Sequence, residues 1–176
     1  MTHLLTPRNG LILTAITIIA LALAFMSGRN EAQIRKRLYA LDQAVDMNDP
    51  EPLLLSVSAA TDIAAFFSEN AQIDIGHPMK VATTRGDFRS AIARIRQRAK
   101  YIKVTIQGME VLMGDDKSTA VVELMLEGKI DAVNRRGSEF REYDIHMSKI
   151  KGEWLIDKIQ HAPSITDPSE FRMPRP

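Results

Sequence analysis

The stretch "SKIKGEWLIDKIQ", from Ser148 to Gln160, predicts a strand, a tight turn and a second strand. Lys151 and Gly152 form the turn, because a two-residue hairpin loop needs residues that tolerate positive φ. The only tryptophan of the chain, Trp154, follows the turn directly. A domain that ends in this way ends in a β-hairpin.

The final strand of this hairpin carries apolar residues on both faces. Strict alternation places Leu155 and Ile159 on one face and Trp154 and Ile156 on the other. We therefore expect the strand to be covered on both sides near the turn. Trp154 is then expected to be a structural plug, or part of a dimer or partner surface, rather than a catalytic group.

Upstream of this hairpin the chain continues the same period-2 pattern through two more strands, which makes four in all. Joints of hairpin length, "GDDK", "NRRG" and "KG", separate them, which predicts an antiparallel meander. The expected strands cover Tyr101–Gly114, Ser118–Val133, Ser138–Ile150 and Glu153–Ala162.

Before residue 101 the period is that of a helix. An apolar stripe from Ile34 to Val45 predicts a first helix, with Asn30 as its N-cap and Gln33 as the capping-box partner. Pro50 and Pro52 break the pattern. A second helix is expected from Leu53 to about Glu69, a short strand over Ala71–Gly76, and a third helix over Thr84–Lys100. Helices followed by strands predict an α+β fold, with three helices on a curved, mostly antiparallel sheet of four to five strands.

This order of elements, ending in "KGEWLIDKIQ", resembles the nuclear transport factor 2-like superfamily. That superfamily includes ketosteroid isomerases, polyketide cyclases of the SnoaL type and scytalone dehydratase. The segment "AAFFSENAQIDI" (Ala64–Ile75) is similar to its helix-to-strand junction, and the resemblance covers about Asn30–Ala162. It implies a cone-shaped fold, which hosts enzymes, binding modules and assembly subunits alike.

The N-terminal segment is uncharged and apolar. The run Leu11–Met26 contains 16 residues, about 24 Å of helix, and its small flanks bring it close to the roughly 30 Å of a bilayer core. We expect an uncleaved membrane anchor. A signal peptide cut after Ala22–Ala24 and a buried core helix are the alternatives. The domains expected are a tail (1–10), an anchor (11–28), a cone domain (29–162) and a Pro-rich tail (163–176).

The membrane orientation is not fixed by the flanking charges. Residues 29–37 carry a net charge of +3, which alone favours a cytoplasmic flank. Short bacterial single-span proteins usually export the C-terminal domain. The localisation expected is the bacterial inner membrane with that domain exported.

Composition excludes several classes of chemistry. The chain has no cysteine, so thiol catalysis, disulfides and cysteine-ligated metals are excluded. The net charge of +1 offers no global field for nucleic acid. The four histidines show no metal-binding spacing, and we expect neither a metal nor a cofactor.

The resemblance implies a pocket on the concave face of the sheet, and three residues are candidates for it. Alternation turns Tyr143 inward as the polar group of an otherwise aliphatic face. At the position where ketosteroid isomerases hold a general base this chain has Ile75, with Asp74 one residue away. Tyr39 on the first helix is the third candidate, and Asp74 with His77 is a weaker base or metal pair. For each, packing or solvation is the competing interpretation.

Two charged surfaces are candidates for docking. The third helix is basic and lacks interleaved aromatic residues, which favours anionic headgroups or an acidic partner over nucleic acid. A solvated face is the alternative for that helix. The convex sheet face carries the second set. The candidate residues are Arg89, Arg94, Arg96, Arg98 and Lys100 on the helix, and Glu123, Glu127, Asp144 and His146 on the sheet.

These features predict a membrane-anchored, non-enzymatic accessory or assembly subunit of a larger membrane complex. Its expected partners are the bilayer through residues 11–28, other subunits of the complex, and a second copy through the convex face. The alternative is a protein that binds or isomerises a small apolar ligand, using Tyr143, Tyr39 and Asp74.

Overall fold

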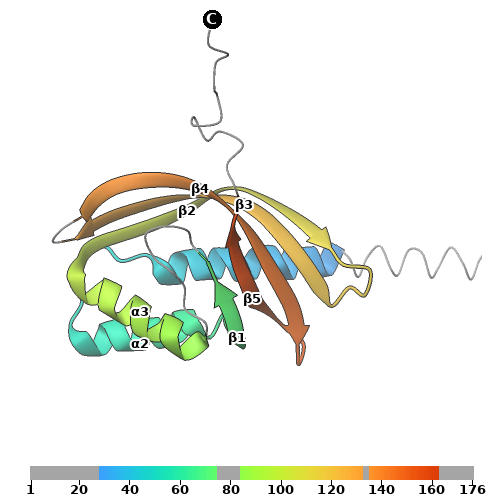
Figure 1. The fold of residues 1–176 in the computed structure, drawn as a ribbon, viewed down its shortest axis with the longest axis horizontal. Coiled ribbons are helices and arrows are strands. Elements are labelled where there is room, and N and C mark those ends of the chain that lie inside the picture. The colour runs from blue at the N-terminus through green and yellow to red at the C-terminus, as the bar shows by residue number, and fades with distance from the viewer. Residues whose placement is uncertain (1–27, 75–83, 133–134, 163–176) are drawn as a thin grey trace, which may run out of the picture.

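The computed structural model describes residues 28–74, 84–132 and 135–162. In this part of the chain three helices lie under the concave side of a curved sheet (Figure 1). The first helix covers residues 28–45, and α2 (Leu53–Ala64) and α3 (Arg85–Arg98) follow it. The strands are β1 (Phe67–Ile73), β2 (Ala99–Met113), β3 (Thr119–Ala132), β4 (Arg135–Ile150) and β5 (Glu153–His161).

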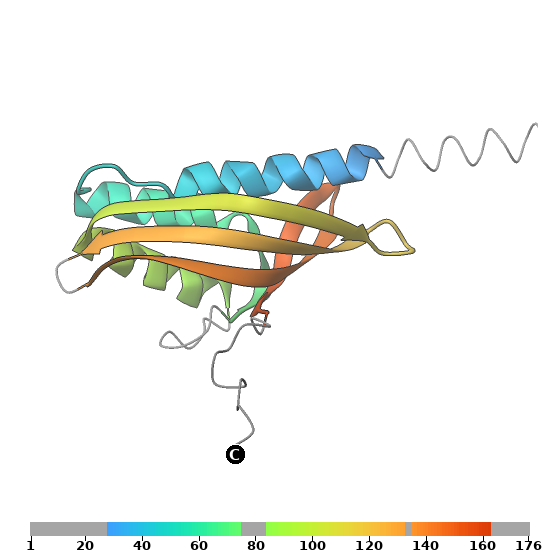
Figure 2. The same ribbon diagram turned by 90° about the horizontal axis from the view of Figure 1, so that it is seen from above.

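The sheet has the order β1-β5-β4-β3-β2, so the predicted meander forms its main part. The three meander pairs are antiparallel, and β1 adds to β5 in parallel. The first helix runs along the β2 side of the domain (Figure 2). After this helix, Met47 and Ile102 exchange two backbone hydrogen bonds of 2.8 Å, which cover part of the free edge of β2. The predicted α+β class is confirmed.

The hairpin between β4 and β5 turns where the sequence predicts it. Lys151 has φ 52° and Gly152 has φ 89°, the left-handed values that such a turn requires. Trp154 is only 3% exposed and belongs to the main core cluster, as expected of a structural plug.

A β-bulge in β5 changes which residues share a face. Met147 pairs with Ile156 but His146 pairs with Lys158, so Asp157 is an extra residue on β5. Beyond the bulge the alternation reverses, and Ile159 packs against the same core as Trp154 and Ile156. The prediction that Leu155 and Ile159 share one face is therefore wrong.

Two element boundaries also differ from the sequence prediction. Helix α2 ends at Ala64 and β1 begins at Phe67, four residues before the predicted strand. Phe67 is 1% exposed, and its ring lies 4.5 Å from that of Phe88 on α3. Burial of this aromatic pair outweighs the helical pattern of the segment.

Asn30 does not cap the first helix, because residues 28 and 29 are already helical. Its side chain is buried and joins two distant segments. Its Nδ2 donates to the carbonyl of Lys117 over 3.2 Å, and its Oδ1 accepts from Lys149 Nζ over 2.8 Å. These bonds fasten the first helix to the β2–β3 turn and to β4.

The membrane anchor predicted over residues 11–28 lies outside the described residues, apart from Gly28. Within the described ranges, none of the helices combines the length and apolar character needed to span a bilayer.

Candidate ligand site at the open end of the cone

The middle of the concave face is closed by side chains. Val122 and Leu124 of β3 and Ile145 and Met147 of β4 are each at most 5% exposed, and they form one cluster with the first helix. Alternation along the strands predicts this inward set. Because the middle is closely packed, a ligand could bind only toward an end of the concave face.

Toward the end that contains Tyr143, the packing loosens. Leu126 lies one inward position beyond Leu124 and pairs with Ile106 and Arg141, and both apolar residues are only partly buried against the core. Ile159 on β5 and Phe88 on α3 are partly buried in the same cluster. These partly buried residues form an apolar surface beside Tyr143.

Tyr143 supplies the polar group of this wall. The residue is 9% exposed and accepts a hydrogen bond from Arg141. Burial raises the pKa of its hydroxyl, Arg141 opposes that rise, and the charges of Glu139 and Asp74 add to it. The net direction is upward, so the hydroxyl is neutral at physiological pH and can donate a hydrogen bond as well as accept one.

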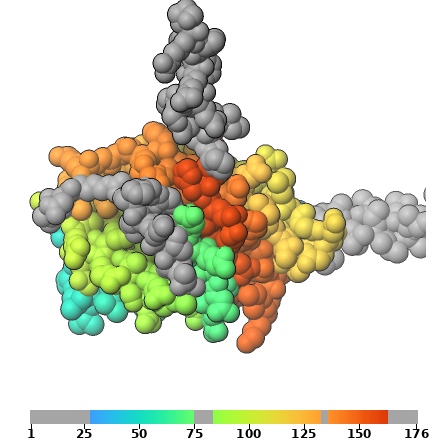
Figure 3. All heavy atoms as spheres, in the orientation of Figure 1, coloured from blue at the N-terminus to red at the C-terminus, as the bar shows by residue number. Residues whose placement is uncertain are grey.

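His161 lies directly opposite Tyr143 across β4 and β5. The two rings meet edge to face, with centroids 5.9 Å apart and an interplanar angle of 88°. The ends of β1 and β5 lie side by side on the molecular surface, with α3 beside them (Figure 3). An imidazole at this position can donate, accept or transfer a proton.

The structure brings the two predicted residues Asp74 and Tyr143 near each other. Asp74 is, however, not a buried general base beside the Tyr143 hydroxyl. Asp74 directly follows β1, and its N–H donates to the carbonyl of Ile159 over 2.8 Å. Its side chain is exposed, and its charge is close enough to raise the pKa of Tyr143. The inward position belongs to Ile73, which is 2% exposed.

The third predicted pocket residue lies elsewhere. Tyr39 is 47% exposed on the first helix, which fits the surface interpretation and not the pocket role. His77, the expected companion of Asp74, lies outside the described residues. Arg141, by contrast, was missed, although it shares the inward alternation of Tyr143. It forms an ion pair with Glu139 at 2.5 Å.

Four of the five candidate basic residues on and after α3 are exposed, namely Arg89, Arg94, Arg98 and Lys100. Arg96 is the exception, because it is 3% exposed and points into the molecule. It therefore cannot contact a headgroup or an acidic partner as predicted.

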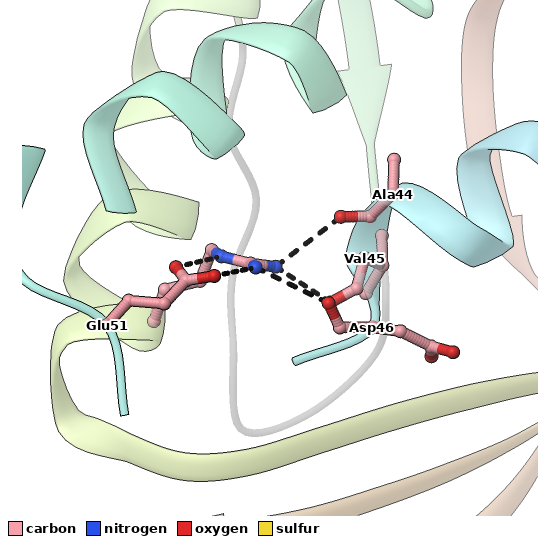
Figure 4. Close-up of polar contacts among 5 residues, drawn as sticks. Ala44, Val45, Asp46 and Glu51 are labelled. Carbon is pink, nitrogen blue, oxygen red and sulfur yellow. Dashed lines mark hydrogen bonds and ion pairs between the residues drawn. The ribbon is translucent and has the colours of Figure 1, made fainter. Parts of the chain in front are cut away.

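The guanidinium of Arg96 joins three segments of the chain (Figure 4). It binds both carboxylate oxygens of Glu51, at 2.9 and 2.6 Å. It also donates to the carbonyls of Ala44, Val45 and Asp46, at 3.5, 2.8 and 3.4 Å. A cation at these last carbonyls complements the negative end of the helix dipole.

The four predicted residues of the convex face lie on β3 and β4. Glu123 is directly opposite Asp144 on one side and Glu110 on the other, which makes a row of three carboxylates across three strands. Glu127 accepts from Gln107 and Ser138 and pairs with Lys129. His146 lies opposite Lys158. In the described ranges, no three His, Asp or Glu side chains converge on a position that could hold a metal ion.

No protein-family model and no curated protein sequence matches this chain. Solved structures do. A protein of Novosphingobium aromaticivorans described as a candidate scytalone dehydratase matches with a TM-score of 0.65 and 14% identity, over 80% of this chain and 89% of that one. A candidate aromatic ring hydroxylase of the same organism matches with a TM-score of 0.66 and 14% identity, over 78% and 90%.

A third similar structure is described by its fold. It is a nuclear transport factor 2-like protein with a cystatin-like fold, again from Novosphingobium aromaticivorans, with a TM-score of 0.61 and 12% identity over 87% of this chain and 92% of that one. At these identities the likeness concerns the fold, and with it the resemblance seen in the sequence is supported. The chain has the cystatin-like fold of these structures.

Proposed function

We propose that the cone domain binds a small, largely apolar molecule that carries one polar group, at the site formed by Tyr143, His161, Arg141 and Asp74. The observation that carries this proposal is the Tyr143–His161 pair on the concave face, next to the row of Leu126 and Arg141, where the apolar packing loosens. The structural neighbours include a candidate scytalone dehydratase and a candidate aromatic ring hydroxylase. They support the ligand-binding alternative better than the accessory-subunit function expected from the sequence.

The chemistry of the site is that of orientation and proton transfer. The neutral hydroxyl of Tyr143 would donate to a carbonyl or hydroxyl oxygen of the ligand. Arg141 holds that hydroxyl in place through its own hydrogen bond. His161 is the group that could move a proton, and isomerisation or cyclisation of a bound ligand is the reaction class that such a pair supports.

The test uses 8-anilinonaphthalene-1-sulfonate, which combines an apolar aromatic body with a polar group and fluoresces when it enters an apolar site. Saturable binding to the full chain is expected. Tyr143→Phe should weaken it by about threefold to tenfold, the value of one lost hydrogen bond. Tyr39→Phe is the matched control, because it removes the same hydroxyl from an exposed tyrosine and should change nothing.

A second variant fills the site instead of removing its polar group. Leu126→Trp adds bulk to the partly buried wall and should abolish saturable binding. If neither Tyr143→Phe nor Leu126→Trp alters the titration while both variants stay folded, the probe binds elsewhere and the proposed site is refuted.

A further inference from the structure

Helix α2 exposes four large apolar side chains within its first five residues. Leu53, Leu54, Leu55 and Val57 are 62%, 83%, 58% and 45% exposed. The inward positions of α2 are Ser56, Ala60, Ile63 and Ala64. The core therefore does not use these leucines, although burial of one such side chain is worth about 1.5–3 kcal/mol.

Positive charge gathers at the same corner of the molecule. The bond between Arg96 and Glu51 holds the start of α2 against the last turn of α3. The exposed residues Arg94, Arg98 and Lys100 flank Arg96 in the sequence. Helices α2 and α3 lie side by side at this end of the domain (Figure 1).

The acidic groups near this corner do not cancel the charge. The first turn of α2 contains no acidic residue. Glu51 is paired with Arg96, and Asp46 is paired with Lys103. Asp49 is the remaining acidic side chain in the segment that joins the first helix to α2. The corner thus combines protruding apolar side chains with a basic surround.

We propose that this corner docks on the surface of an anionic lipid bilayer. The four apolar side chains would enter the boundary between headgroups and acyl chains, and Arg94, Arg98 and Lys100 would contact the lipid phosphates. Apolar side chains beside Lys and Arg are the combination that binds anionic bilayer surfaces. Here α2 supplies the apolar side chains, and α3 and the start of β2 supply the basic ones. Charge complementarity favours lipid over a second copy of the chain, since the second copy would present the same basic corner.

The proposal is independent of the ligand site and of the expected N-terminal anchor. The blue N-terminal end of the first helix lies at the opposite end of the domain from α2 (Figure 1). A readout at the corner itself can therefore separate local docking from membrane attachment through residues 11–28.

The chain has no cysteine, so Leu54→Cys creates a unique labelling position. The full chain would carry an environment-sensitive nitrobenzoxadiazole label there and be mixed with vesicles of phosphatidylcholine, with or without phosphatidylglycerol. We expect the emission to shift to the blue on anionic vesicles only. Glu153→Cys, an exposed position at the start of β5, is the control and should not shift.

Charge dependence gives a second arm. Each Lys or Arg near an anionic surface contributes about fivefold to binding, so Arg94→Gln with Arg98→Gln should weaken the response at position 54 by about 25-fold. Equal unfolding midpoints of the parent and the double variant show that the loss is not unfolding.

Four results would overturn the proposal. They are no shift at position 54, an equal shift at position 153, an equal shift on neutral vesicles, and a shift without vesicles that grows with protein concentration. The last would assign the corner to self-association.

Discussion

Replacement of Arg96 by methionine tests the central polar contact of the domain. The substitution keeps much of the side-chain length and removes the guanidinium. It leaves the Glu51 carboxylate without its bidentate partner and the carbonyls of Ala44, Val45 and Asp46 without a donor. Breaking a buried ion pair in this way costs about 3–5 kcal/mol.

The lower end of that range applies here. The Arg96 side chain is 4% exposed but that of Glu51 is 21% exposed, so water can reach part of the abandoned carboxylate. We expect a loss of about 3 kcal/mol in the free energy of unfolding, and a fall of about 9 °C in the unfolding midpoint for a protein of this size. Urea unfolding measures this free energy, and thermal unfolding measures the midpoint. The fluorescence of Trp154, the single and buried tryptophan, reports both transitions.

Two further variants isolate the cause. Arg94→Met makes the same substitution at an exposed position of the same helix and should stay within about 0.5 kcal/mol of the parent. Adding Glu51→Gln to Arg96→Met should recover part of the loss, because the abandoned charge is then gone. An Arg96→Met protein within 1 kcal/mol of the parent would show that the network does not hold the helices together.

Three smaller predictions follow from other sites. Glu123→Gln should raise the unfolding midpoint at low salt, because it removes like charges that face Glu110 and Asp144, and an unchanged midpoint would show that they do not repel measurably. Gly152→Ala should destabilise by about 1 kcal/mol in urea unfolding, because its φ of 89° disfavours a side chain; a neutral result would contradict the turn conformation. Burial and the charge of Asp46 raise the pKa of Asp42, so its folded form binds a proton more tightly than the unfolded chain. Asp42→Asn should therefore raise the free energy of unfolding at pH 7. This gain should shrink as the pH falls through the raised pKa of the folded state, and vanish below the pKa of the unfolded chain. A gain that stays constant with pH would contradict this reasoning.

The sequence predicts the hairpins and the inward faces well because both rest on local rules. The turn residues predict the hairpins, and the alternation of apolar and polar residues alone places Val122, Leu124 and Tyr143 on the core side. The start of β1 is predicted poorly because burial of Phe67 against Phe88, contributed by a distant helix, decides it. A pattern confined to one segment does not contain that contact.

The ligand site shows the same limit at the level of single residues. Counted outward from Lys151 and Gly152 without a bulge, the residue opposite Tyr143 is Gln160. The extra residue at Asp157 shifts the register by one and puts His161 there instead. A one-residue shift in a strand exchanges its two faces, so a single bulge decides whether an imidazole or an amide faces the tyrosine.

Arg96 shows why the basic helix divides between two roles. Arg94, Arg96 and Arg98 are the same residue type at alternate positions of one helix. Among the described residues, Arg96 is the one of the three that binds a carboxylate, 45 residues away at Glu51. That pair fixes the end of the first helix and also holds the start of α2 beside the exposed arginines. The buried arginine thereby creates the corner at which Leu53, Leu54 and Leu55 meet positive charge. The proposed membrane contact thus depends on a residue that never reaches the surface.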